Sequence, residues 1–118
     1  MALIQLIAVH ESEYGTRDFA NAVCSALNLS GFHERESSHY DEGFYFQGKY
    51  GEIVVNISLS ESEYPDLPYW ISVRDQQTSE DDLNKIVETS IIPRLIANGF
   101  HLARLEPFGR SDEVRIDY

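Results

Sequence analysis

Apolar side chains occupy every second position between residues 53 and 59, and this period of two is the clearest pattern in the chain. The apolar positions are Ile53, Val55, Ile57 and Leu59, and the positions between them carry Val54, Asn56 and Ser58. A period of two is the period of a β-strand. This segment is therefore predicted to be a central strand with one face on the core.

Weaker patterns predict further strands around it. Residues 44–47 precede the central strand across Gly48-Lys49-Tyr50-Gly51, which is typical of a hairpin loop. Residues 69–75 also alternate, with Tyr69, Ile71 and Val73 on one side and Trp70, Ser72 and Arg74 on the other. Residues 32–40 alternate but are very polar, which favours an edge strand. Residues 100–106 and 114–118 are predicted to be the last two strands.

Two amphipathic helices are predicted, and a similar short phrase follows each. The first covers residues 17–29 with Thr16 as its N-cap, and the second starts at Ser79. Gly31 and Gly99 are each followed by Phe-His. Because glycine adopts the left-handed conformation without a side-chain penalty, both glycines are expected to end a helix.

The order of elements predicts an α+β fold with two helices on one face of a mostly antiparallel sheet. We expect a ferredoxin-like (split βαβ) fold or a related sandwich, formed by residues 1–118 as a single domain. Residues 3–10 are interpreted as a strand, although a short helix competes because the segment is short. Pro93 is expected to kink the second helix near Thr89 or Ser90.

The net charge limits the classes of partner that this domain could bind. Nine Lys and Arg residues stand against 20 Asp and Glu residues, for a formal net charge of −11. Such a field repels nucleic-acid phosphates and anionic membranes, so neither is expected as a partner. It attracts a basic protein, although acidity that serves only solubility gives the same composition.

The compartment is expected to be the cytoplasm. Cys24 is the only cysteine, so no disulfide forms within the chain, and a reducing compartment is the simplest setting. The apolar start lacks a basic segment and is followed at once by His10 and Glu11, which argues against a signal peptide. No apolar run approaches the roughly 20 residues of a membrane span.

Candidate catalytic or metal-binding groups are sparse. His33 and His101 follow the two glycines equivalently and could be neighbours in the sheet, but no further Cys or His spacing supports a metal site. Glu34 and Glu36 share one strand face at a spacing that could suit acid–base catalysis, but a solvated edge strand explains it with fewer assumptions. Cys24 is expected to pack as a small apolar side chain. No phosphate-binding loop or nucleophile motif is present, so no cofactor is expected.

The sheet face opposite the helices is the best candidate for binding. Aromatic residues and arginine are enriched at protein interfaces, and this face combines both with small polar residues. An alternative is that Trp70 packs under the loop of residues 61–68. The predicted binding residues are Tyr45, Asn56, Ser58, Trp70, Ser72 and Arg74.

The expected function is therefore that of a non-enzymatic acidic protein-binding module for a basic partner. An inhibitor or an immunity-type protein, which neutralises a toxin by binding it, has this general character of size and charge. The alternative is a small-molecule binding or regulatory domain, with the ligand between the open sheet face and the loop of residues 61–68. A homodimer through this face is compatible with both, and an enzyme is the least favoured class.

Overall fold

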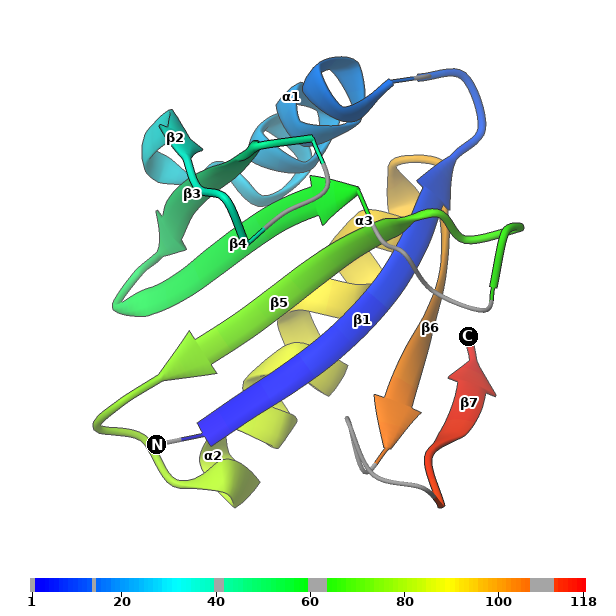
Figure 1. Ribbon diagram of the computed structural model, residues 1–118. Coiled ribbons are helices and arrows are strands. Elements are labelled where there is room, and N and C mark those ends of the chain that lie inside the picture. Colours follow the sequence, from blue (N-terminus) through cyan, green and yellow to red (C-terminus); the bar gives the residue numbers. More distant parts are fainter. Residues whose placement is uncertain (1, 14, 40–41, 60–63, 107–111) are drawn as a thin grey trace.

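The structure, a computed structural model, describes residues 2–13, 15–39, 42–59, 64–106 and 112–118. These residues form one seven-stranded antiparallel sheet in the order β2-β3-β4-β5-β1-β6-β7 (Figure 1). The strands are β1 (Ala2–His10), β2 (Ser30–Glu36), β3 (Phe44–Tyr50), β4 (Ile53–Leu59), β5 (Tyr69–Asp75), β6 (Phe100–Glu106) and β7 (Val114–Asp117). The helical segments are α1 (Thr16–Leu27), α2 (Glu80–Ile86), η1 (Val87–Ile91) and α3 (Ile92–Ala97).

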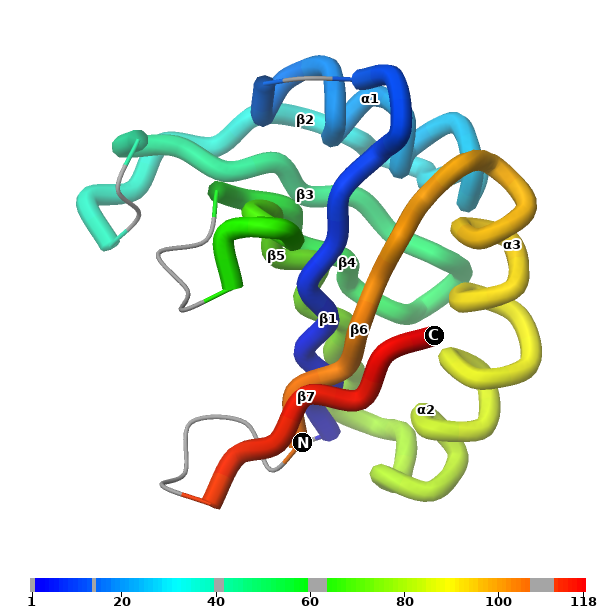
Figure 2. Tube along the Cα trace, turned by 90° about the vertical axis from the view of Figure 1, so that its right-hand side faces the viewer, coloured from blue at the N-terminus to red at the C-terminus, as the bar shows by residue number. Residues whose placement is uncertain are grey.

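The helical segments all lie on one side of the sheet, as Figures 1 and 2 show from two directions. From β1 the chain passes through α1 to the far edge strand β2 and returns through β3 and β4 to β5, beside β1. The continuous run of α2, η1 and α3 then leads to β6 on the other side of β1. The predicted arrangement, helices on one face of an antiparallel sheet, is confirmed, and the sheet is larger than a four-stranded split βαβ sheet.

The main core lies between the sheet and the helices. The residues that alternate inward along β4 and β5 are buried, as the period of two predicts. Phe19 of α1 stacks on Tyr69 with ring centroids 4.3 Å apart and meets the edge of Phe100 at 5.5 Å. Each large side chain buried in this layer contributes roughly 1.5–3 kcal/mol.

The N-terminal segment is a strand. Ala2–His10 forms β1, which pairs with β5 on one side and β6 on the other. A strand with neighbours on both sides satisfies its backbone groups throughout, and side chains of β1 on both faces are buried. The strand interpretation of residues 3–10 is therefore confirmed over the competing helix.

The end of α1 corrects the expectation for the first glycine. α1 ends at Leu27, and Asn28 takes the left-handed conformation with φ 54°. Gly31 has φ 61° but lies within β2, where the register shifts between Ser30 and His33. Asparagine tolerates the left-handed region better than most residues, so it can end a helix in place of glycine. Gly99 follows α3 with φ 88°, as expected.

The helix before β6 is irregular where Pro93 predicts it. Pro93 lies in the first turn of α3, directly after the π-helical turn η1. The backbone N–H of Ile92 donates to the carbonyl of Val87, five residues earlier. Since proline has no N–H and clashes with the preceding turn, a wider turn before it relieves the conflict. Ser79 caps α2 by accepting from the Asp82 N–H at 3.1 Å.

The predicted strand limits hold best for the central strands. β4, β5 and β6 match their predicted ranges, whereas β2 ends at Glu36 instead of residue 40 and β3 extends to Tyr50. Among the described residues, no helix combines the length and apolar character needed to cross a lipid bilayer.

Candidate functional site: the open sheet face

A row of side chains crosses the sheet on the face opposite the helices. The strand registers place seven residues in line, one from each strand: His33, Gln47, Asn56, Ser72, Gln5, Leu105 and Arg115. The Gln47 amide donates to the Asn56 side-chain oxygen at 2.8 Å, and Ser72 donates to the Gln5 oxygen at 2.6 Å. These bonds fix the polar side chains of the row in place.

The half of this face formed by β1 and β6 is covered. Leu67, which precedes β5, is buried in a second apolar cluster with Ile7, Ala103 and Leu105. Tyr64 and Trp70 pack against the same cluster. Arg115 of β7 reaches across to Asp66 with two hydrogen bonds, at 3.0 and 2.8 Å, which holds this segment beside the sheet. The chain therefore closes this half of the face by itself.

The other half, formed by β2–β5, is polar and partly exposed. We name it the polar patch, and it consists of Arg35, Tyr45, Gln47, Lys49, Val54, Asn56, Ser72 and Arg74. Arg35 donates to the Gln47 oxygen at 3.0 Å and lies over the Tyr45 ring. Hydrogen bonds thus hold Arg35, Gln47, Asn56 and Ser72 of the patch in place.

The six predicted binding residues do not all share one environment. Tyr45, Asn56, Ser72 and Arg74 are half-buried in the polar patch. Ser58 is 3% exposed, so it is part of the interior although its strand face was predicted correctly. Trp70 is half-buried at the boundary, where it packs against the cluster of Leu67. This contact with Leu67 agrees with the alternative expectation that Trp70 packs under the loop before β5.

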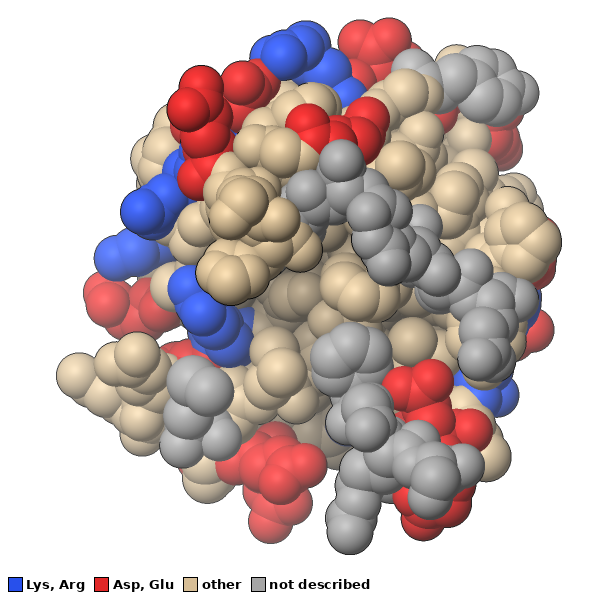
Figure 3. Space-filling model, in the orientation of Figure 1, with Lys and Arg blue, Asp and Glu red and all other residues tan. Residues whose placement is uncertain are grey.

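Cations gather on the polar patch of this acidic protein. Arg17, Arg104 and Arg115 form ion pairs with carboxylates. Within the described residues, no carboxylate lies within ion-pair distance of Arg35, Lys49 or Arg74. Figure 3, a view onto the open face, shows blue atoms along the side formed by β2–β4 and red atoms toward the margins. The sequence prediction includes Arg74 but not Arg35, Gln47 or Lys49. Gln47 shares a strand face with the predicted Tyr45, and Lys49 is predicted to lie in the hairpin loop, whereas β3 extends through it to Tyr50.

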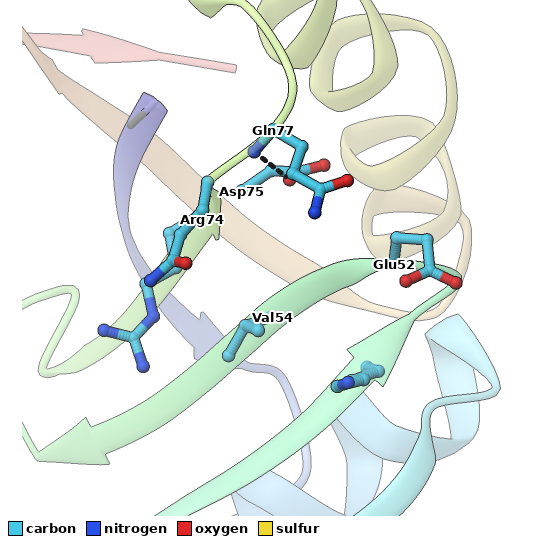
Figure 4. Close-up of a pocket in the computed structure, with 7 residues that line it drawn as sticks. Glu52, Val54, Arg74, Asp75 and Gln77 are labelled. Atoms are coloured by element: carbon cyan, nitrogen blue, oxygen red, sulfur yellow. Dashed lines mark hydrogen bonds between the residues drawn. The ribbon is translucent and has the colours of Figure 1, made fainter.

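A cavity of about 250 Å³ lies at the end of the patch where β5 leads toward α2. Figure 4 shows Val54 between Arg74 and Glu52, with Gln77 on the opposite wall. The Asp75 carboxylate in this wall accepts the Gln77 N–H at 2.9 Å and the Thr78 hydroxyl at 2.5 Å. These hydrogen bonds, that of Thr78 above all, lower the pKa of Asp75. Asp75 therefore closes the turn before α2.

The other candidate groups lie apart from one another. His33 is on edge strand β2 and His101 on β6, with four strands between them, so the expectation that they could be neighbours is wrong. Glu34 pairs with Arg17 at 2.6 Å on the helix side of the sheet. Cys24 packs against the main core. Among the described residues, no three His, Cys, Asp or Glu side chains gather as a metal-binding group would require.

Comparison of the chain with protein-family models, with curated proteins and with solved structures gives no match. The polar patch is therefore interpreted from its own geometry and charge.

Proposed function

We propose that this chain is a non-enzymatic protein-binding module that docks a basic protein partner through the polar patch. The observation that carries the proposal is the asymmetry of the sheet. One face is packed against all the helices and half of the other is closed by the segment around Leu67, whereas the side chains of the polar patch stay at least partly exposed within the described part of the chain. Gln47, Asn56 and Ser72 are held by hydrogen bonds and lose little conformational freedom on binding, which favours this surface as a contact.

The charge of the chain supports a basic partner. A net charge of −11 accelerates the encounter with a positively charged protein, and this acceleration weakens as salt screens the field. Acidic residues such as Asp18, Glu80 and Glu88 lie on the helix side, so they attract the partner to the molecule as a whole, and the cations of the patch oppose this attraction locally. Occlusion of the partner's own active surface is the mechanism we infer, as in an inhibitor or immunity-type protein.

The scattered positions of the ionisable candidates support a binding role over an enzymatic one. His33, His101 and Cys24 lie on different elements, and Glu34 is held by Arg17. An acid–base or nucleophilic mechanism needs two such groups within hydrogen-bond reach of each other. The small-molecule alternative is less favoured, since Leu67 already fills the space between its own segment and Ile7.

The strand order suggests that the sheet has four core strands and, on one side of them, two added strands that widen the binding surface. We propose that β4-β5-β1-β6 form a split βαβ core. Among these four strands, α1 lies in the chain between β1 and β4, and the run of α2, η1 and α3 lies between β5 and β6. β2 and β3 then extend this core on one side and supply Arg35, Gln47 and Lys49 to the patch. The added strands thus widen the accessible part of the face.

The test is capture from the native host lysate at low and high salt, followed by purification of the retained protein. The proposal expects a basic protein that is retained at low salt by the wild-type chain and lost from an Asn56→Arg variant. Asn21→Arg, on the exposed side of α1, is the matched control and should retain it. Retention by the Asn56 variant, or the absence of any basic protein, would overturn the proposal.

A further inference from the structure

We propose that Lys49 and Arg74 together receive a carboxylate of the protein partner, above the side chain of Val54. This inference rests on the proposed function and specifies the chemistry that the partner presents. The partner is then basic overall but carries an Asp or Glu side chain at the centre of its contact surface.

The sheet register sets the two cations at a suitable separation. Lys49 pairs with Val54 across β3 and β4, and Val54 pairs with Arg74 across β4 and β5. All three side chains point to the open face, and adjacent strands lie about 4.8 Å apart. The two cation-bearing positions are therefore roughly 10 Å apart at the backbone, within reach of one group held between them.

Both cations are available within the part of the chain that the structure describes. Neither forms an ion pair there, unlike Arg17, Arg104 and Arg115. A charge-assisted hydrogen bond is roughly twice as strong as a neutral one, and arginine binds a carboxylate with two parallel donors. A partner carboxylate at this place would contact a planar guanidinium on one side and an ammonium on the other.

The carboxylates nearby do not fill this role. Asp75 lines the same cavity, but its oxygens are occupied by Gln77 and Thr78. Glu52 also lines the cavity, on the far side of Val54 from Arg74 (Figure 4). Glu52 would repel an incoming carboxylate, so its removal should strengthen the contact.

A side chain presented by a protein suits this place better than a free organic acid. Among the described residues that line the cavity, all but Val54 are polar or charged, whereas small-molecule sites are mostly apolar. The net charge of −11 repels a free anion. A carboxylate on a basic protein is not repelled in this way, because the negative net charge attracts the basic protein that carries it.

A matched pair of peptides tests the inference without the natural partner. Both are acetylated and amidated heptapeptides with two lysines at each end, and the middle is Gly-Glu-Gly in one and Gly-Gln-Gly in the other. Binding is followed by nuclear magnetic resonance chemical shifts at low salt. We expect the glutamate peptide to bind about threefold or more tightly, despite its lower positive charge, and to shift Lys49, Arg74 and Gln77.

Three variants of the chain sharpen the comparison. Arg74→Gln should abolish the preference for the glutamate peptide, and Glu52→Gln should enlarge it. Arg94→Gln is the matched control, because Arg94 lies over Tyr50 on the helix side of the sheet, and should leave the preference unchanged. Equal or tighter binding of the glutamine peptide, or a preference that survives Arg74→Gln, overturns the inference.

The outcomes for the two proposals are distinguishable. If the purified partner binds the patch but tolerates Arg74→Gln, the inference fails and the proposed function stands. If the glutamate peptide is preferred but no protein docks on the patch, the proposed function fails, and only the carboxylate preference of Lys49 and Arg74 stands, without a protein partner.

Discussion

Ser72 donates its hydroxyl hydrogen to the side-chain oxygen of Gln5 at 2.6 Å, across the pairing of β5 with β1. Gln5 is only 3% exposed, and its amide nitrogen donates to the Leu6 carbonyl at 2.9 Å. Both ends of this buried amide are therefore hydrogen-bonded. The pair lies where the covered half of the open face meets the polar patch, so it ties the position of the patch to the central strand.

Removal of the Ser72 hydroxyl should destabilise the fold. Ser72→Ala leaves the Gln5 oxygen without this donor in a buried place, which costs about 1–3 kcal/mol of the free energy of unfolding. Urea unfolding measures the loss. Ser25→Ala, at an exposed position of α1, is the control and should change stability by less than about 0.5 kcal/mol. Equal stability of the two variants would show that this hydrogen bond does not stabilise the fold.

Substitution of Gly99 should cost mainly its backbone strain. Gly99 has φ 88°, and a Cβ there would lie 2.8 Å from the Glu11 carboxylate oxygen. That oxygen ends an exposed and flexible side chain, so it can move aside. Gly99→Ala should therefore cost about as much as Gly43→Ala, at a glycine with φ 77°, which is about 1–2 kcal/mol. A clearly larger loss for Gly99→Ala in thermal unfolding, removed in a Glu11→Ala background, would contradict this expectation.

The lowered pKa of Asp75 predicts a pH dependence on the acid side. The folded pKa lies below that of the unfolded chain, about 3.9, so the stabilisation is present above the unfolded value. It is lost as the pH falls through the folded pKa. Thr78→Val removes the strongest cause of the shift, so the loss of stability between about pH 5 and pH 3 should become shallower. Thr89→Val, at an exposed helix position, is the control in acid unfolding series and should keep the wild-type slope.

Tyr118 predicts a second pH dependence, on the alkaline side. Burial, and then the hydrogen bond to Glu88 at 2.6 Å, raise the pKa of Tyr118 to about 12. Because the raised pKa favours the neutral phenol in the folded state, its contribution to stability is present below about pH 10 and lost as the pH rises through about 12. Glu88→Gln should lower this pKa without returning it to 10, since burial is the larger cause. Difference titration of phenolate absorbance against Tyr118→Phe measures it, and an unchanged value would exclude the Glu88 contribution.

The sequence predicts the elements of this fold better than their arrangement. Alternation over residues 53–59 and 69–75 is a local property, because one face of a strand meets the core along its whole length. The order of the seven strands depends on which edges pair, and no local pattern records that α1 crosses to the far edge of the sheet. Asn28 ended α1 in place of the expected glycine because two residue types tolerate the same backbone conformation.

The candidate site was predictable only in part for the same reason. Asn56, Ser72 and Arg74 could be predicted because they alternate with the core residues of β4 and β5. They therefore lie on the opposite face of the sheet. Gln47 lies on the same face as Tyr45 by alternation, and Lys49 joins them because β3 continues to Tyr50 instead of ending before the predicted loop. The register of β3 with β4 then places Lys49 opposite Val54. The packing of Trp70 against Leu67 is a contact between a strand and a loop, so its burial depends on the tertiary fold.

The most direct test of the polar patch is the affinity of the purified natural partner for charge-reversed variants of the folded chain. Lys49→Glu and Arg74→Glu change the patch, whereas Lys85→Glu and Arg94→Glu make the same change in net charge on the helical segments. The account predicts about a tenfold or greater loss of affinity for each patch variant and less than about a threefold change for each helix variant, as measured by calorimetry. Equal losses in both pairs, or a loss confined to the helix variants, would contradict docking through the polar patch.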